Sequence, residues 1–360
     1  MDLTGVVKMS NTYGSNPELV LAGGGNTSVK TEDTLWVKGS GTQLATITAE
    51  GFVAMDRKKL AEILTKEYPS EDQAREAAYT ADVMTAKCPG EEGKRPSVEV
   101  LLHHLFPQTY ILHVHPAMVN GLTCGQDGEK LARELLGEEL LWIGIVRPGY
   151  TLARLCCDEM AAYKARTGKD VDLILMQNHG IFFAGNDLDE IAALVSRVMS
   201  KLEAHVGRKP ELEATGATAE ALVERLSKLG GAARFVDAKD AIAMAASREI
   251  AAPLLKSFTP DHIVYYGAFP LYTTAETLEA DFAAHTEATG VAPKVVIIEG
   301  VGIFTVADSD KNAATAEMLL RDAVKIAVYS ESFGGPLHMT DDLVNFILHW
   351  EAESYRKKQN

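Results

Sequence analysis

The chain is 360 residues long, which favours two domains over one. With 46% hydrophobic and 24% charged residues it can bury a substantial core, which excludes a disordered chain, a collagen-like chain and a disulfide scaffold. The 4 cysteines are too few to staple a fold and form no Cys-x-x-Cys pair, so we expect reduced thiols in a cytoplasmic protein. They are Cys88, Cys124, Cys156 and Cys157.

The net charge of −15 comes without a basic face, so we expect no nucleic-acid partner. An anionic substrate would need local backbone dipoles and a few lysines or arginines. Residues 1–10 lack the pattern of a targeting signal. The longest apolar runs, such as Val171–Met176, are far shorter than the ~20 residues of a transmembrane helix, so we expect no membrane partner.

Segments with the apolar spacing of a strand alternate along the chain with segments that have the apolar spacing of a helix, which predicts a layered α/β fold. In chain order we expect a strand at 35–37, helices over 56–68 and 99–106, a strand over 109–115, a helix over 156–166, strands at 171–176 and 182–183, and a helix over 188–205. Helices over 219–229 and 275–288 and a strand over 294–299 follow. The polar segment 207–218 predicts a linker, so the expected domains are 1–208 and 209–360.

Two segments of the chain resemble each other. Leu173–Gly185 and Val295–Ala307 each contain a four-residue apolar strand, three variable residues and Gly-Ile-Phe, at an offset of 122 positions. A weaker match sets Phe106–His115 against Phe258–Gly267, at an offset of 152. In the same order, the two matches predict that the second domain is a duplicated copy of the first. The alternative is that two buried strands merely look alike.

Three histidines form the strongest candidate site. His113 and His115 lie two apart at the end of an expected strand, so both side chains point to one face. His179 follows another expected strand, and Gly180 after it lets the backbone turn sharply. Three imidazoles leave one position open on a metal, as in catalytic zinc sites. The alternative is three unrelated core histidines.

Glu99 opens an expected helix just before the strand of His113. Beside a metal-bound carbonyl, a carboxylate there could move a carbon-bound proton as general base and acid. The alternative is an acidic residue that only favours the first turn of a helix, and the residues alone favour this alternative. His103, four residues on, is more consistent with a supporting or core histidine than with a fourth ligand.

Two glycine-rich turns, Gly23–Ser28 and Lys38–Thr42, could form backbone nests for a phosphate. Neither matches the P-loop or the dinucleotide-binding pattern, and short glycine turns are usually only turns.

Taken together, five motifs in this order resemble class II aldolase/adducin proteins, most of all the aldolase part of bifunctional rhamnulose-phosphate aldolase/alcohol dehydrogenase proteins. The motifs are Gly25–Ser28, Ser40-Gly41, Pro96-Ser97-x-Glu99, His113-x-His115-Pro116 and Asn178-His179-Gly180. The resemblance covers residues from about 20 to 205 and continues more weakly to Gly300–Phe304.

The resemblance implies a three-layer α/β/α fold and a function. His113, His115 and His179 would bind Zn²⁺ or another divalent metal, and Glu99 would be the acid/base. The phosphate of the substrate would be held by Asn26, Ser40, Gly41 and Ser97. A ketose phosphate would be cleaved to dihydroxyacetone phosphate and an aldehyde through an enediolate. One departure is Val98, where such aldolases often have a second serine.

Other outcomes stay open at this level. The same metal and glutamate could serve an epimerase or a 3-oxo acid phosphate decarboxylase, and adducin-like relatives are non-catalytic binding proteins. A zinc hydrolase is disfavoured because the chain has no His-Glu-x-x-His motif. The resemblance also implies a homo-oligomer. With the two offsets, Ala251, Tyr265, Gly267 and Val301 fall opposite Glu99 and the three histidines, so we expect the second domain to have lost the site.

Overall fold

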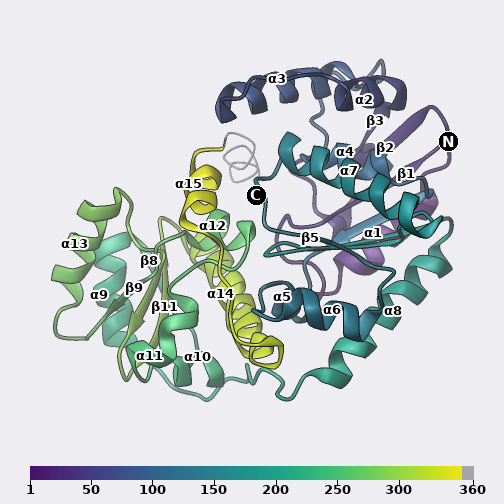
Figure 1. Ribbon diagram of the computed structural model, residues 1–360. Helices are drawn as coiled ribbons and strands as arrows, with labels where there is room; N and C mark the ends of the chain where they lie inside the picture. The colour runs from purple at the N-terminus through teal and green to yellow at the C-terminus, as the bar shows by residue number, and fades with distance from the viewer. Residues whose placement is uncertain (351–360) are drawn as a thin grey trace. The chain divides into compact units, whose positions relative to one another are not determined.

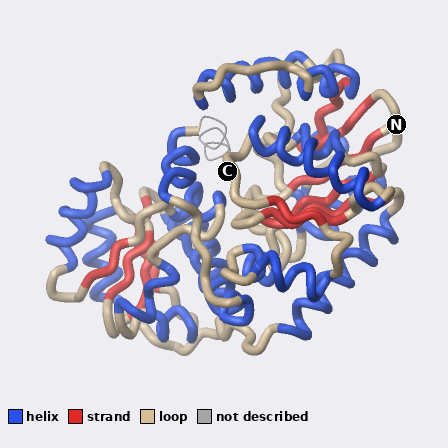
Figure 2. The backbone as a smooth tube through the Cα atoms, viewed as in Figure 1, coloured by secondary structure: helices blue, strands red, loops and turns tan. Residues whose placement is uncertain are grey.

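The computed structural model describes residues 1–350 and divides them into two compact units (Figure 1). The first unit consists of Met1–Val119, Glu129–Ala204 and Trp350. The second consists of Asn120–Gly128 and His205–His349. Each unit has its own sheet, drawn in red in Figure 2.

The first unit contains a seven-stranded sheet in the order β3-β2-β1-β4-β7-β6-β5. Its strands are β1 (Asn26–Lys30), β2 (Thr34–Lys38), β3 (Phe52–Asp56), β4 (Tyr110–Val114), β5 (Leu141–Ile143), β6 (Leu173–Met176) and β7 (Gly180–Gly185). Neighbouring strands are antiparallel except for β5 and β6, which are parallel.

Helices accompany these strands along residues 1–205. They are α1 (Thr4–Gly14), η1 (Leu44–Thr46), η2 (Ala49–Gly51), α2 (Arg57–Leu64), α3 (Asp72–Thr85), α4 (Val100–Leu105), α5 (Ala117–Thr123), α6 (Gly128–Leu136), α7 (Tyr150–Thr167) and α8 (Leu188–His205). The mixed α/β fold expected from the sequence is confirmed.

Alternation along the strands gives the seven-stranded sheet two buried faces. One face, which includes Ile111 and Phe182, packs in a single apolar cluster with residues of α2, α3, α4 and α7. On the other face, the hydroxyl of Thr27 lies 2.7 Å from that of Ser10 on α1. The sheet therefore lies between helices, and His113, two residues after Ile111, projects to the face covered by α4.

The second unit contains a four-stranded sheet in the order β8-β11-β10-β9. Its strands are β8 (Ala232–Phe235), β9 (Leu271–Thr273), β10 (Val295–Ile298) and β11 (Gly302–Ala307). Its helices are α9 (Glu220–Gly230), α10 (Lys239–Met244), α11 (Arg248–Ala251), η3 (Ala252–Leu254), α12 (Pro260–Tyr266), α13 (Leu278–Thr289), α14 (Asp310–Ser330), η4 (Glu331–Phe333) and α15 (Asp341–His349).

The four strands of the second unit repeat the pairing of β4 to β7. Strands β10 and β11 are antiparallel, and Ile298 is opposite Gly302 as Met176 is opposite Gly180. Strand β9 is parallel to β10 as β5 is to β6. In the middle of the turn, Gly300 has a positive φ of 69° where Asn178 has 55°. The offset of 122 positions between these hairpins thus holds in three dimensions.

The second offset expected from the sequence, 152 positions, is wrong. Phe258–Gly267 does not form a strand: Pro260 opens helix α12, because its fixed φ suits the first turn and Thr259 caps it. The counterpart of β4 is β8, in which Phe235 is opposite Phe304 as His113 is opposite Phe182.

The strand pairing therefore changes the expected correspondences. Phe235, and not Tyr265, stands at the position of His113, and Asp237, and not Gly267, follows at that of His115. The expected equivalence of Ala251 to Glu99 was based on the same offset of 152 positions, so it is wrong too. Val301 stays opposite His179.

Within residues 1–350, no helix combines the length and the apolar character that crossing a membrane requires. All four cysteines are free thiols.

Candidate metal centre and acid/base site

The three histidines expected to form a site meet at one point of the seven-stranded sheet. His113 is in β4, His115 follows that strand, and His179 is in the tight turn between β6 and β7. Because β4 pairs directly with β7, the turn comes next to the end of β4. One ring nitrogen from each histidine lies within 4.8 Å of the other two, so the group could hold a metal ion.

The surroundings of His113 prepare its ring to act as a ligand. Its Nδ1–H donates to the backbone carbonyl of Ile181 at 2.9 Å, and the ring stacks on Phe182 with centroids 4.0 Å apart. Burial lowers the pKa of His113 well below its usual value, so the imidazole is neutral. Its Nε2 lone pair then faces Nε2 of His115 at 2.8 Å. A hydrogen bond to the second ring nitrogen is the usual support of a metal-bound histidine.

The turn that carries His179 depends on two backbone features. Asn178 has a positive φ of 55°, which asparagine tolerates better than most residues. At Gly180, an added Cβ would lie 2.6 Å from the carbonyl oxygen of Val114 and 2.7 Å from Cδ2 of His115. Only glycine therefore lets β7 approach β4 closely enough to bring His179 beside His115.

Glu99 precedes the first residue of α4 and reaches into the histidine cluster. Its Oε2 accepts a hydrogen bond from Nδ2 of Asn26 at 2.7 Å and lies 3.4 Å from Nε2 of His113. Its Oε1 is buried, accepts no hydrogen bond among the described residues, and lies 3.3 Å from Nε2 of His179. Burial raises the pKa of Glu99, whereas the imidazoles, to the extent that they carry a proton, and the Asn26 amide lower it, to about 2 overall.

These donors fit a divalent cation. The set comprises three imidazoles, at least one of them neutral and oriented, and an ionised carboxylate with an unpaired oxygen. Nitrogen-rich sites of this kind are typical of zinc, and three histidines leave a coordination position open.

The residues expected to hold a phosphate fall into two adjacent groups. Ser40, Gly41 and Ser97 come together because Gly39 and Pro96 form an isolated β-bridge, with the Ser97 N–H donating to the Lys38 carbonyl at 2.9 Å. Asn26 lies instead against Glu99, two residues beyond Ser97. Ser97 also has a local role, since its Oγ accepts from the backbone N–H of Glu99 at 3.3 Å.

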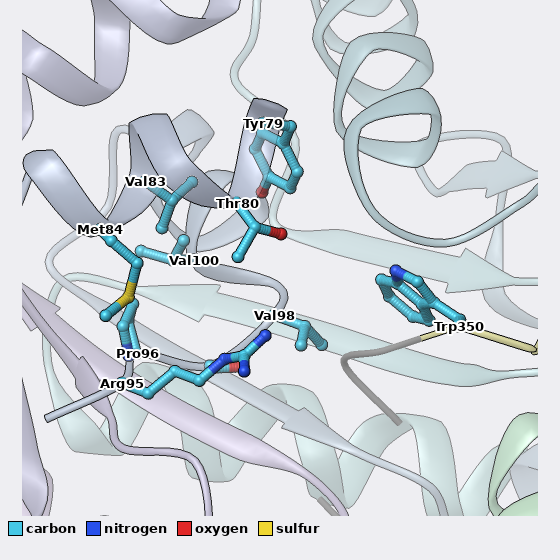
Figure 3. A pocket seen from close by; sticks show the side chains of 10 residues that line it. Tyr79, Thr80, Val83, Met84, Arg95, Pro96, Val98, Val100 and Trp350 are labelled. Atoms are coloured by element: carbon cyan, nitrogen blue, oxygen red, sulfur yellow. The ribbon is translucent and has the colours of Figure 1, made fainter. Parts of the chain in front are cut away.

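A mainly apolar pocket adjoins the segment that leads to Glu99 (Figure 3). It contains about 350 Å³ of empty space, part of it open to solvent. Val98 lines it, so an apolar wall stands where the resemblance expects a second serine. The other lining residues are Tyr79, Thr80, Val83, Met84, Arg95, Pro96, Ser97, Val100 and Trp350.

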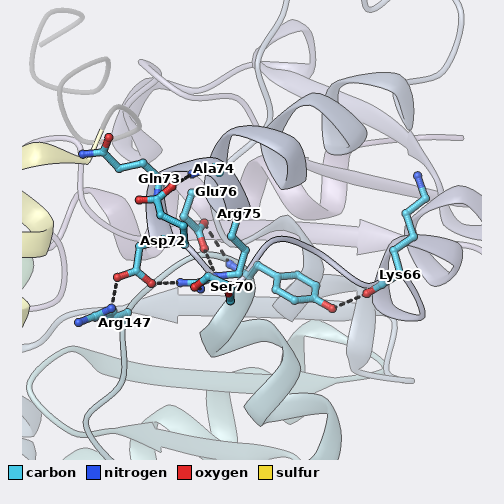
Figure 4. A network of polar contacts seen from close by, with 10 residues as sticks. Lys66, Ser70, Asp72, Gln73, Ala74, Arg75, Glu76 and Arg147 are labelled. Atoms are coloured by element: carbon cyan, nitrogen blue, oxygen red, sulfur yellow. Dashed lines mark hydrogen bonds and ion pairs between the residues drawn. The ribbon is translucent and has the colours of Figure 1, made fainter.

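A polar network fastens α3, one wall of this pocket (Figure 4). Asp72 accepts from both Arg75 and Arg147, and Oε2 of Glu76 accepts from the backbone N–H of Tyr150 at 3.2 Å. Tyr150 begins α7, so the Glu76 carboxylate caps that helix and interacts favourably with its dipole. Helix α3 is thereby tied to the start of α7.

Sequence reasoning left the contacts of one strand undetected. Asn26, Ser28 and Lys30 alternate along β1 and therefore share a face, and all three contact α4 or the glutamate that precedes it. Polar residues at every second position of a buried strand were the signal in the sequence that could have revealed these contacts. His103, the α4 residue that they surround, contacts Ser28 and Asn26 through its two ring nitrogens.

A family model of the class II aldolase and adducin N-terminal domain matches residues 6–205. The chain belongs to this family. The matched segment contains the three histidines, Glu99 and the four residues expected to hold a phosphate.

Known proteins resemble this class II aldolase-family chain to different extents. A Bacillus subtilis (strain 168) protein described as uncharacterized oxidoreductase YuxG is 22% identical over 408 aligned positions, which cover 98% of this chain. The chain spans only 57% of that relative's length.

Solved structures resemble somewhat more than half of the chain. The N-terminal class II aldolase domain of a conserved Thermoplasma acidophilum protein is 28% identical, with a TM-score of 0.48, over 57% of this chain and 93% of that one. L-fuculose-1-phosphate aldolase from Thermus thermophilus is 16% identical, with a TM-score of 0.36, over 56% of this chain and 93% of that one.

Replacing Gly180 by alanine should weaken metal binding about 10- to 100-fold, the usual cost of disturbing the surroundings of a ligand. The new methyl group would displace the His115 ring or the Val114 backbone. Titration calorimetry with Zn²⁺ measures the effect. Gly93→Ala is the control, because no atom lies within 4 Å of its added Cβ. Equal affinities of the two variants would contradict this account of the turn.

The stability of the first unit should fall below pH 6.5 because His103 is buried as a neutral ring. Burial, opposed in part by Glu99, lowers the pKa of His103 to about 3. The unfolded chain, with a pKa of about 6.5, binds the proton first, so stability present above pH 6.5 is lost at about 1.4 kcal/mol per pH unit as the pH falls towards 3.

Urea unfolding with a chelator at pH 7 and pH 5 measures this loss. Tryptophan fluorescence reports the first unit, since Trp36, Trp142 and Trp350 all belong to it. The wild type should lose about 2 kcal/mol more than His103→Gln, which cannot titrate. The same pH dependence in both proteins would exclude a neutral buried His103.

Proposed function

We propose that this chain is a metal-dependent carbon–carbon lyase that cleaves a ketose phosphate to dihydroxyacetone phosphate and an aldehyde. The observation that carries the proposal is the unpaired Oε1 of Glu99, buried 3.3 Å from Nε2 of His179 beside three converging imidazoles. A carboxylate oxygen in that place is suited to move a proton at a carbon next to a bound carbonyl.

In this proposal His113, His115 and His179 hold one Zn²⁺ or a similar divalent ion. When bound there, the ion supplies Lewis-acid polarisation of the substrate carbonyl. The neutral state of His113 supports the assignment, since a protonated imidazole cannot be a ligand.

Glu99 transfers the proton. In synthesis its ionised carboxylate takes a proton from the carbon beside the carbonyl, that carbon attacks the aldehyde, and the oxygen of the former aldehyde takes up the proton as a hydroxyl. In cleavage the hydroxyl that becomes the aldehyde oxygen gives up its proton to the ionised Glu99, the electron pair of the broken carbon–carbon bond returns to the carbon beside the carbonyl, and Glu99 delivers the proton to that carbon. The pKa of about 2 supports the ionised form as the resting state.

The phosphate end of the substrate would lie on the turn of Ser40 and Gly41 and on Ser97, with the second amide hydrogen of Asn26 nearby. These groups are backbone and hydroxyl donors, which suit an anion on a chain with a net charge of −15. The apolar Val98 takes no part in holding the phosphate.

We also propose that 1–208 is the catalytic domain and 209–360 a degenerate copy of it. The shared strand register supports the duplication. Phe235, Asp237 and Val301 at the positions of the three histidines leave no zinc-binding set there. A copy without chemistry is suited to assembly, so we further propose a homo-oligomer, located in the cytoplasm where its free thiols stay reduced.

A screen of ketose phosphates and 3-oxo acid phosphates tests the function, with aldehyde and carbon dioxide both monitored. Release of an aldehyde together with dihydroxyacetone phosphate is the expected result. Carbon dioxide without aldehyde would indicate a decarboxylase, and a sugar isomer without either product an epimerase. A purified chain without metal and without turnover would favour a binding protein of the adducin type.

Glu99→Gln should keep the metal and lose about 10²- to 10⁴-fold in turnover, the usual contribution of a general acid/base. The amide preserves the size of the side chain but cannot take a proton. Metal analysis and steady-state kinetics on the same preparation measure both effects. Near-normal turnover would remove Glu99 from the mechanism, and loss of the metal would assign it to the ligand set.

A further inference from the structure

Polar side chains occupy every second position of β1 and face α4, the helix that begins directly after Glu99. Asn26, at one end, donates from Nδ2 to Oε2 of Glu99 at 2.7 Å, and its Oδ1 contacts Nε2 of His103. In the middle, the Ser28 hydroxyl lies 2.7 Å from Nδ1 of His103. All four side chains are buried, and that of His103 is completely so.

The direction of every hydrogen bond in this set of contacts follows from the orientation of the Asn26 amide. Its Nδ2 donates to Oε2 of Glu99, so the NH₂ group faces the carboxylate. The Asn26 oxygen then faces Nε2 of His103, which must carry the hydrogen. Nδ1 is left as an acceptor, and the Ser28 hydroxyl donates to it. Only one tautomer of a neutral His103 satisfies all three contacts.

The far end of α4 is held by the same strand. Nζ of Lys30 donates to the backbone carbonyls of His103 at 2.6 Å and Phe106 at 2.7 Å. These carbonyls lie at the C-terminal end of the helix, where a cation is favoured. Strand β1 therefore fixes both the position of α4 along the sheet and the rotation of the His103 ring.

We propose that His103 is a positioning residue, which acts through Asn26 to decide which oxygen of Glu99 moves the proton. By holding the Asn26 amide in one orientation, it keeps Oε2 occupied and leaves Oε1 directed at the substrate. This inference rests on the proposed role of Glu99 as acid/base. It adds a residue outside the reacting groups that sets the geometry of the transfer.

In a second interpretation, His103 has only a structural role, as a buried side chain that packs in the core. Both interpretations predict that removal of the ring destabilises the protein, because a buried polar contact is lost. They differ on turnover. A positioning role predicts a loss in kcat with little change in KM or metal content, since a misplaced carboxylate affects only the chemical step.

The experiment compares His103→Leu with His103→Gln. Leucine fills the space but makes no hydrogen bond, whereas the glutamine amide can donate to Asn26 and accept from Ser28. His103→Leu should lower kcat about 10²-fold with one metal per chain retained. His103→Gln should recover most of that loss.

His262 in α12 supplies the matched control. It is also a completely buried histidine with polar partners on both ring nitrogens, Thr259 and Asp322, and it belongs to the second unit. His262→Leu should lower stability and leave kcat unchanged. If His103→Leu and His262→Leu reduce kcat equally, or if glutamine recovers nothing, the positioning role is wrong.

A measurement without substrate separates this inference from the proposed function. In the metal-loaded wild type, ¹⁵N NMR of labelled histidine should show His103 as the neutral Nε2–H tautomer. The Nδ1–H tautomer or an imidazolium would overturn the positioning role of His103 whatever the reaction is. Conversely, the expected tautomer in a protein that cleaves no ketose phosphate would support the hydrogen bonds from His103 to Glu99 through Asn26 and reject the lyase assignment.

Discussion

The pairing of β1 with β4 is the constraint on which the whole site depends. Asn26 is directly opposite His113 in this antiparallel ladder, so both side chains point to the face covered by α4. Glu99 reaches that point from the start of α4 and contacts both. A slip of one residue would turn Asn26 to the face of α1 and leave the buried carboxylate without its amide. The register is fixed because both faces of the sheet are buried.

The same strands explain why burial is compatible with so many polar groups. The Glu99 carboxylate, the Asn26 amide, the His103 ring and the Lys30 ammonium all lie in the interior, where an unpaired polar atom is costly. Nearly every polar atom in this set has a partner on the neighbouring element. The exception among the described contacts is Oε1 of Glu99, and its position beside the three histidines is why we assign the chemistry to it.

The second unit separates the features that the fold keeps, such as the hairpin turn, from the side chains and strands that only the site of the first unit has. Its sheet keeps the pairing of β10 with β11 and the positive φ at Gly300, which correspond to features that position His179 in the first unit. It has no counterpart to β1, β2 and β3 in the order of its sheet. The partners that orient Glu99 in the first unit are therefore missing, together with the histidines themselves. A backbone can keep its turn after the side chains that used it have changed.

The sequence by itself determined the α/β class, the helix over Leu188–His205 with both of its ends, and the common face of His113 and His115, because periodicity and spacing along one strand are local properties. His179 was expected beside them from the family resemblance, and the pairing of β4 with β7 places it there. It did not determine the structure of Phe258–Gly267, where the capping of α12 outweighs a resemblance to a strand. Likewise, only the tertiary structure decided that Asn26 contacts Glu99 and that Ser28 and Lys30 hold α4. Those contacts join residues more than 70 positions apart, and the register of strand pairing that creates them is settled by the burial of both faces of the sheet.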